Sequence, residues 1–212
     1  MSKDTITTLV KTIIDGEINN DNIAKLFHLL YPTKFLYDLT NQKWYSINEY
    51  GIYHSENDDL QTARLLISEE FKNFIKNKYD EIWKKANNAN QVRLSKILPK
   101  LISNLCNESP KKNIIGAMIK YYGKEKIYEQ MDNVNKYVFA FNNGVWDLKN
   151  KCFRHAKPEK LITTTTSYDY VTPKQKYVSE IQSILDNIFP DKAKQTHTLK
   201  TIALCLAGIN SM

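Results

Sequence analysis

The sequence predicts an α+β protein that is mainly α-helical, with a small antiparallel sheet made of hairpins. Apolar residues recur at helical spacing through most of residues 60–122, which favours several amphipathic helices. Asn143-Gly144 separates two β-prone runs, 137–141 and 145–148, and this is the strongest short-range signal for a hairpin. With 212 residues and 42% hydrophobic content, the chain is long enough for one good core, or one core plus a satellite.

Two helices and a hairpin are expected in the first part of the chain. The first helix should end at Gly16, and Asp21 should cap a second helix that ends before Pro32. Residues 35–47 form the expected hairpin, which Trp44 should stabilise through cross-strand aromatic contacts.

A third strand is expected at residues 50–53. Together with the hairpin at 137–148, these strands predict one small sheet assembled from distant parts of the chain.

The middle of the chain is expected to be helical. One long helix should begin at Asp58 or Asp59 and run to Trp83. The next helix, 92–105, contains Pro99, which is expected to kink or split it because proline cannot donate the helical hydrogen bond.

A further helix should begin at the Ser109-Pro110 pair and stop at Gly123. Beyond the central hairpins, residues 161–166 are β-branched and are expected to form a strand. Pro173 should open a helix, and Asp191 should cap the last one. No run is apolar enough to span a bilayer and no signal peptide is recognisable, so we expect an intracellular protein.

The positive charge of the protein is concentrated in its middle. Residues 72–126 carry 13 basic and 4 acidic side chains, a net charge of +9, whereas residues 1–71 carry a net charge of −5. A basic layer of helices can neutralise phosphates without reading base sequence. The competing interpretation is a solvated lysine-rich surface. We hypothesise a DNA-facing surface formed by Lys72, Lys76, Arg93, Lys96, Lys100, Lys111, Lys112 and Lys120.

The residues do not predict a catalytic or metal site. The six glycines are not arranged as a phosphate-binding loop, and the histidines are scattered. The acidic pairs Asp58-Asp59 and Glu69-Glu70 fit a helix cap or a solvated face better than a two-metal centre. A nuclease or primase activity within this chain is therefore poorly supported.

The three cysteines, Cys106, Cys152 and Cys205, lie far apart and are expected to be reduced, buried thiols. Residues 152–155 resemble half a zinc knuckle, but the chain supplies no second pair of ligands at a usual spacing.

The tryptophans Trp44, Trp83 and Trp146 have two interpretations. They are expected to pack in the core, and the alternative is that they stack on unpaired bases. Asn143 and Gly144 are expected to have a conformational role and to supply the positive φ of the turn.

The order of short motifs resembles a known viral family. Residues 138–148 read Val-Phe-Ala-Phe-Asn-Asn-Gly-Val-Trp-Asp-Leu, followed by Lys-Pro-Glu at 157–159 and Thr-Thr-Ser-Tyr-Asp-Tyr at 165–170. This order is similar to that of the domain just upstream of the superfamily 3 helicase in the primase-helicases of poxviruses, giant DNA viruses, phages and plasmids. The residues that match the structural motif are Trp44, Asn143, Gly144, Asp147, Tyr168 and Tyr170.

The resemblance implies a single collar-type domain over residues 1–205, with 206–212 as the lead-in to a helicase domain outside this chain. It implies no ATPase, primase or cofactor in this fragment, and ATP and Mg²⁺ for the parent helicase. The implied roles are ring assembly, as a hexamer in the parent protein, connection of primase to helicase, and guidance of single-stranded or forked DNA. The implied location is the viral factory in the host cytoplasm.

The alternative function is a stand-alone adaptor, such as a replication-initiation or virion protein, that binds protein partners and not DNA. The two functions differ in whether a helicase module follows in the same gene, and in whether the isolated chain binds oligonucleotides.

Overall fold

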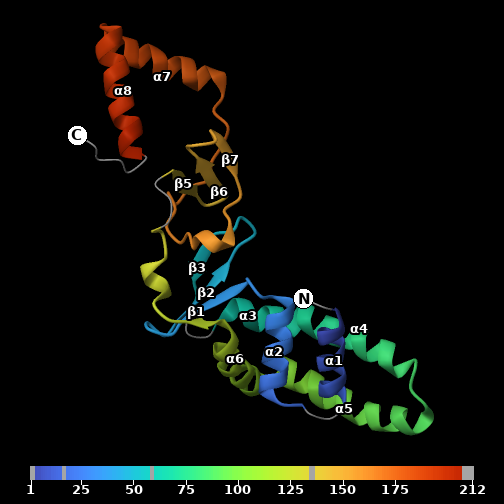
Figure 1. Cartoon of the computed structure of the whole chain (residues 1–212). Coiled ribbons are helices and arrows are strands. Elements are labelled where there is room, and N and C mark those ends of the chain that lie inside the picture. Colours follow the sequence, from blue (N-terminus) through green and yellow to red (C-terminus); the bar gives the residue numbers. More distant parts are fainter. Residues whose placement is uncertain (1–2, 16–17, 58–59, 134–136, 207–212) are drawn as a thin grey trace. The chain divides into compact units, whose positions relative to one another are not determined.

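The computed structural model describes residues 3–15, 18–57, 60–133 and 137–206 (Figure 1). It confirms the α+β class, with helices dominating and the strands confined to two small sheets. The chain divides into two compact units, of which the first comprises Met1–Ile47 and His54–Tyr128 and the second comprises Asn48–Tyr53 and Glu129–Met212.

The first unit begins with two short helices, α1 (Lys3–Ile14) and α2 (Asn20–Leu30). The N-cap of α2 is Asn19, whose side chain accepts a hydrogen bond from the backbone N–H of Asn22. The expectation that Asp21 is the cap was wrong by two residues. Asp21 lies in the first turn, where a carboxylate still interacts favourably with the helix dipole.

The hairpin of the first unit lies where the sequence predicts it. Strands β1 (Phe35–Asp38) and β2 (Lys43–Ile47) pair antiparallel, and β3 (Tyr53–Ser55) and β4 (Gly123–Lys124) complete a sheet of order β3-β2-β1-β4. Asp38 is fully buried, and its carboxylate accepts hydrogen bonds from Thr40 N and Asn41 Nδ2, which closes the turn.

The helical layer contains α3 (Gln61–Leu66), a π-helical turn at Ile67–Phe71, α4 (Lys72–Trp83), α5 (Asn88–Cys106) and α6 (Glu108–Tyr122). The predicted start at Asp58 or Asp59 lies outside the described residues. Pro99 is accommodated within α5, which continues through it as one helix. The cap of α6 is Asn107 and not Ser109, whereas Gly123 terminates α6 as predicted.

The core of the first unit is aromatic and aliphatic. Phe27 of α2 packs against Phe35 of β1 and against Phe71, with ring centroids 5.9 and 5.3 Å apart, and all three side chains are buried. Leu101 and Leu105 of α5 are buried in the same cluster. Burial of this continuous apolar surface is the main stabilising contribution to the unit.

The second unit is built on a three-stranded antiparallel sheet of order β5-β6-β7, formed by β5 (Val138–Phe141), β6 (Gly144–Asp147) and β7 (Cys152–Arg154). These strands therefore form a sheet of their own, and the prediction of one common sheet with the first hairpin was wrong. The described residues of the segment 161–166 form no regular strand, although Thr166 N donates to Ala140 O at 3.0 Å.

Two helices, α7 (Gln175–Ile188) and α8 (Lys192–Leu206), follow the sheet (Figure 1). Asp191 caps α8 as predicted, because its Oδ1 accepts hydrogen bonds from Ala193 N and Lys194 N. A short 3₁₀ helix, Pro158–Lys160, lies between β7 and the threonine-rich segment.

The thiols of Cys106, Cys152 and Cys205 are free but exposed, so the expectation of buried cysteines was wrong. Cys106 is the last residue of α5, Cys152 is the first residue of β7, and Cys205 lies one residue before the end of α8.

None of the helices in the part of the chain that is described is long and apolar enough to cross a membrane.

Candidate nucleic-acid interface

The basic residues expected to face DNA lie on three consecutive helices of the first unit. α4 carries Lys72 and Lys76, α5 carries Arg93, Lys96 and Lys100, and α6 carries Lys111, Lys112 and Lys120. Of the lysines, Lys76, Lys96, Lys100, Lys112 and Lys120 are exposed, and Lys72 is half-buried.

Helix α5 presents an ordered row of positive charge. Arg93, Lys96 and Lys100 follow each other at intervals of three and four residues, so they lie on one side of the helix. The buried residues Leu94 and Leu101 define the opposite, core-facing side. Arg93 is held by Asp15, with 2.5 Å between Nη2 and Oδ1, whereas Lys96 and Lys100 make no ion pair among the described residues.

Lys111 does not belong to this exposed set. Its side chain is 7% exposed, pairs with Glu108 at 2.5 Å and donates to Ser68 Oγ at 3.0 Å. A buried ammonium that is already paired is poorly available to a phosphate, so the structure does not support Lys111 as part of a DNA-facing surface. Lysine is amphipathic, and its position in the pattern did not distinguish a solvated from a buried head group.

Lys120 is exposed but paired with Asp21, with 3.0 Å between Nζ and Oδ1. The hydrogen bond from Lys120 lowers the pKa of Asp21, and the same bond raises the pKa of Lys120. Lys120 also lies 5.4 Å from the ring centre of Tyr121. A phosphate would have to compete with this carboxylate, which makes Lys120 a weaker candidate than Lys96 or Lys100.

In the second unit, the motif residue Asn143 holds a distant segment in place. Its Oδ1 accepts from Tyr170 N at 2.8 Å, and its Nδ2 donates to Tyr170 O at 3.0 Å. The positive φ of the turn belongs to Gly144, at +148°, and Asn143 is absent from the described residues with positive φ. The expectation that Asn143 supplies backbone conformation was therefore wrong, and its contribution is this pair of side-chain hydrogen bonds.

Asp147 organises the turn between β6 and β7. Its carboxylate accepts hydrogen bonds from Lys149 N, Asn150 N and Asn150 Nδ2, and from Arg154 Nε and Nη2. The hydrogen bonds from Asn150, followed by that from Arg154, lower the pKa of Asp147 to about 2. Asp147 is thus a structural anchor that is ionised at neutral pH and also fixes the direction of the Arg154 side chain.

One face of the β5-β6-β7 sheet is aromatic. Phe139 and Trp146 are directly opposite each other in the register, and Trp146 is opposite Phe153. Tyr170 covers this face, stacked on Phe153 with 4.5 Å between centroids and tilted against Trp146 at 5.3 Å. Tyr168 contacts Phe141 edge-on at 5.7 Å and is 60% exposed.

The three tryptophans differ in exposure. Trp44 is buried in the core of the first unit at 6% exposure, as expected, and Trp83 is half-buried against Tyr79. Trp146 is also half-buried, so its indole packs against Tyr170 and keeps only part of its surface exposed.

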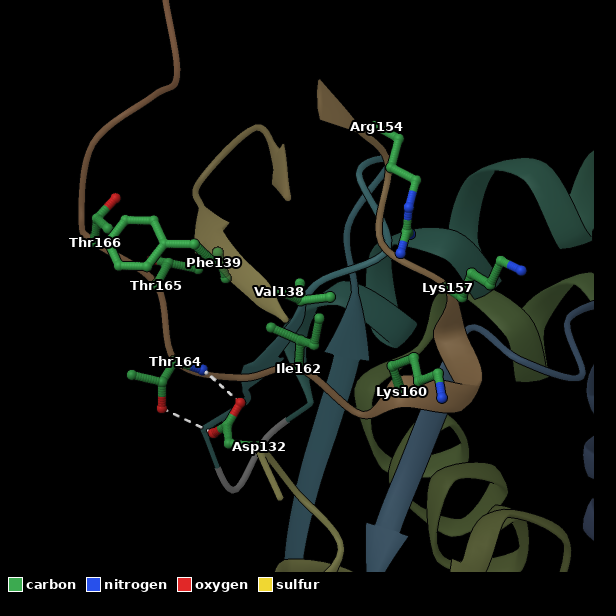
Figure 2. Close-up of a pocket in the computed structure, with 11 residues that line it drawn as sticks. Asp132, Val138, Phe139, Arg154, Lys157, Lys160, Ile162, Thr164, Thr165 and Thr166 are labelled. Atoms are coloured by element: carbon green, nitrogen blue, oxygen red, sulfur yellow. Dashed lines mark hydrogen bonds between the residues drawn. The ribbon is translucent and has the colours of Figure 1, made fainter. Parts of the chain in front are cut away.

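The opposite, aliphatic face of the same sheet borders a cavity of about 320 Å³. Val138, Ala140 and Ile162 form its apolar wall, and Figure 2 shows Arg154, Lys157 and Lys160 on one side of that wall. Asp132 and three consecutive threonines, 164–166, lie on the other side. Arg154, Lys157 and Lys160 are not among the basic residues predicted to contact a ligand. Their only signal was local, three basic residues within seven positions after a predicted hairpin.

No group of three or more potential metal ligands is present in residues 3–15, 18–57, 60–133 and 137–206. Burial lowers the pKa of His28, and its ring contacts those of Tyr121 and Tyr122. This environment is that of a packed side chain in the core of the first unit.

A family model described as "D5 N terminal like" matches residues 24–190, which is well over half of the chain. The chain belongs to the D5 N-terminal-like family. The resemblance noted from the motifs at 138–170 is thereby confirmed, because these motifs lie within the matched region.

Two curated viral proteins are similar to this D5 N-terminal-like chain. One, from Acanthamoeba polyphaga mimivirus, is named "Putative helicase" and is 28% identical over 95% of this chain and 22% of its own length. The other, from Invertebrate iridescent virus 6, has the same descriptive name and is 33% identical over 44% of this chain and 10% of its own length. The chain therefore spans about a fifth of the first relative and a tenth of the second.

The D5 N-terminal-like match includes the described residues of both units between positions 24 and 190. It covers most of α2, both sheets, the basic helices α4, α5 and α6, and all but the last helix of the second unit. Both the exposed row on α5 and the cavity beside β5 therefore lie within the region that defines the family.

Proposed function

We propose that this chain is a non-catalytic DNA-replication domain of a larger viral primase-helicase. The larger protein would use ATP and Mg²⁺ in a helicase domain outside this chain and act in the host cytoplasm. The proposal is supported by membership of the D5 N-terminal-like family and by the two relatives that are named as helicases.

Within that protein, the domain guides single-stranded or forked DNA by its phosphates. The observation that carries this proposal is the exposed pair Lys96 and Lys100 on α5, which makes no ion pair among the described residues. Lys76 and Lys112 add exposed positive charge on the neighbouring helices. Cations of this kind bind phosphates irrespective of base sequence and release counterions on binding.

The test is fluorescence anisotropy of labelled single-stranded and forked DNA at several salt concentrations, with the variant Lys96→Glu/Lys100→Glu. If both lysines contact phosphates, the negative slope of log K against log salt should become shallower by about 1.4, because each lost single-strand contact removes about 0.7 from its magnitude. The matched control is Lys149→Glu/Lys174→Glu, which makes the same change of net charge at exposed positions of the second unit.

An unchanged slope in the α5 variant, or an equal change in the control, would contradict the assignment of the DNA contact to α5. In that case the lysines belong to a solvated surface, and the domain would act by connecting the primase and helicase domains of the parent protein.

Self-association is the second proposed role, and α7 favours it. Tyr177, Ile181, Ile184 and Ile188 are 54–61% exposed and follow each other at intervals of four, three and four residues. This is the spacing of a seam between two helices. The seam is self-complementary, because an antiparallel second copy would place Ile181 opposite Ile184 and Tyr177 opposite Ile188.

We propose a second copy of this chain as the occupant of the α7 seam, as a step toward the hexameric ring of the parent protein. Light scattering should give a mass that rises with concentration, and Ile181→Asp/Ile184→Asp should return it to that of the monomer. The control is Ser179→Asp/Ser183→Asp, at exposed polar positions of the same helix. A monomer at all concentrations would contradict this occupant and favour the helicase or primase domain of the same protein, or the partner of a stand-alone adaptor.

A further inference from the structure

We propose that the cavity beside β5 in the second unit binds a nucleoside phosphate, either free or at the phosphorylated end of a nucleic-acid strand. The proposal concerns the described residues that line this cavity, Asp132 and members of the segment 138–166, and does not depend on the DNA contact proposed for α5.

One side of the cavity carries cationic side chains that can bind a phosphate. Arg154, Lys157 and Lys160 line it, and in Figure 2 their nitrogen-bearing ends lie on the same side of the apolar wall. Neither Lys157 nor Lys160 forms an ion pair with any residue that the structure describes. Glu159 lies between them in sequence but does not line the cavity. Among the described residues of the lining, Asp132 is the one carboxylate, and these residues carry three positive charges and one negative charge.

Arg154 is fixed before any ligand binds. Its Nε and Nη2 donate to Asp147 Oδ2 at 3.2 and 3.1 Å, and its Nη1 donates to His155 O at 3.0 Å. A guanidinium has five N–H donors, so two remain for a phosphate oxygen after these three bonds. A side chain that is held in this way loses little conformational entropy on binding.

The side opposite the cations is rich in acceptors. Asp132 accepts from the backbone N–H and hydroxyl of both Thr163 and Thr164, with 2.7 and 3.1 Å to the two amides. Thr165 Oγ1 donates to Asn142 Oδ1 at 2.6 Å. These hydroxyl protons are already used, so the oxygens are left as acceptors for a ligand that carries donors, such as sugar hydroxyls or a base amine.

Between these two sides, Val138 and Ile162 provide an apolar surface (Figure 2). The ligand must therefore carry an anionic end, a flat or apolar middle and hydrogen-bond donors, which are combined in a nucleoside phosphate. Small-molecule sites usually occupy about 300–1,000 Å³. At about 320 Å³, this cavity suits a mononucleotide better than a dinucleotide.

The test is calorimetric titration of the folded chain with adenosine 5′-monophosphate, adenosine and inorganic phosphate. We expect the nucleotide to bind with a Kd of about 1 mM or tighter. Adenosine and phosphate alone should each bind at least about tenfold more weakly, since each lacks one of the two interactions.

The variant Lys157→Glu/Lys160→Glu should weaken nucleotide binding by about tenfold or more. The control Lys149→Glu/Lys174→Glu, with the same change of net charge, should leave it unchanged. Ala140→Leu, which fills the cavity without changing charge, should also weaken binding, and urea unfolding of each variant checks that it is folded. The α5 variant Lys96→Glu/Lys100→Glu should bind the nucleotide normally, which separates this proposal from that of the DNA contact.

The source of the phosphate is distinguished by comparing oligothymidines with a 5′-phosphate and a 5′-hydroxyl. Loss of the preference for the phosphorylated end in Lys157→Glu/Lys160→Glu would assign the cavity to strand ends, and equal binding of both oligomers would assign it to free nucleotides. Absence of nucleotide binding at millimolar concentration, binding that the cavity variants do not change, or equally tight binding of inorganic phosphate would overturn the proposal.

Discussion

Replacing Asn143 by alanine should destabilise the second unit, because Asn143 makes both side-chain hydrogen bonds to the backbone of Tyr170. Each hydrogen bond of this kind contributes a net of about 0.5–1.5 kcal/mol to stability. Two bonds give an expected loss of about 1–3 kcal/mol in the free energy of unfolding. The loss should lie in the upper part of this range if no water molecule accepts a hydrogen bond from the half-buried Tyr170 N–H in the variant.

Native-state hydrogen exchange at the Tyr170 amide measures this loss at the position where it arises. In the wild type, the amide is bonded to Asn143 Oδ1 at 2.8 Å and should be protected, whereas in Asn143→Ala it should exchange faster by about tenfold or more. The matched control is Asn187→Ala, at an exposed position of α7, which should leave the Tyr170 amide unchanged.

An unchanged exchange rate at Tyr170 in Asn143→Ala would refute the reasoning, because it would show that the segment is held without this side chain. Faster exchange of Asn142 N, which donates to Tyr168 O at 3.1 Å, would show that the loss extends along the segment.

Three further predictions concern the same unit and the core of the other. Gly144→Ala should destabilise the hairpin, since an added Cβ would lie 2.8 Å from Arg154 O at a φ of +148°, and thermal unfolding should show a lower Tm. Asp147→Asn should lower the free energy of unfolding at neutral pH. In urea titrations, the difference in this free energy between the variant and the wild type should shrink as the pH falls from about 4 toward 2. The reason is that hydrogen bonds from Asn150 depress the folded-state pKa of Asp147 from 3.8 to about 2, so the stabilisation is present above the unfolded pKa and lost as the pH falls through the folded pKa. Leu101→Ala should cost about 2–5 kcal/mol of unfolding free energy by urea titration, because Leu101 is 1% exposed in the core of the first unit.

Local signals predicted the hairpins well. The turns after β1 and β5 lie where turn-forming residues separate β-prone runs, and strands β1 and β2 have the predicted bounds. These turns are determined by short-range interactions, such as the hydrogen bonds from Thr40 and Asn41 to Asp38. A turn that depends on hydrogen bonds between residues close in the sequence can be predicted from the sequence.

Helix caps were predicted less well, because several residues near each helix start are able to cap it. Asp21 was predicted to cap α2, but the cap is Asn19, and Ser109 was predicted to cap α6, but the cap is Asn107. In each case the helix itself was expected. A cap is selected by the backbone conformation that precedes the helix, which tertiary packing determines.

Pairing between strands that lie far apart in the chain was the feature that the sequence predicted least well. The two hairpins have the same alternating pattern, and nothing in either run specifies which strands become neighbours, so two separate sheets were predicted as one. Lys111 illustrates the same limit for single residues. Its burial results from contacts with Glu108 and with Ser68, which lies 43 residues away in sequence.

The candidate sites differ in predictability for the same physical reason. The row on α5 follows from helical periodicity, since Leu94 and Leu101 define the buried side and leave Lys96 and Lys100 outside. The cavity beside β5 depends instead on the hydrogen bonds of Asp132 to Thr163 and Thr164, 31 and 32 residues further along the chain.

These hydrogen bonds also hold the carboxylate ionised. Burial alone would raise the pKa of Asp132, but the bonds from Thr163 and Thr164 together outweigh it and lower the pKa. The carboxylate therefore keeps the threonine-rich segment in place on the acceptor side of the cavity at neutral pH. Asp132→Asn should loosen this segment and weaken nucleotide binding even though it removes a negative charge from the lining. A purely electrostatic site would instead bind the phosphate more tightly in this variant, so calorimetric titration of Asp132→Asn distinguishes a shaped cavity from a patch of positive charge.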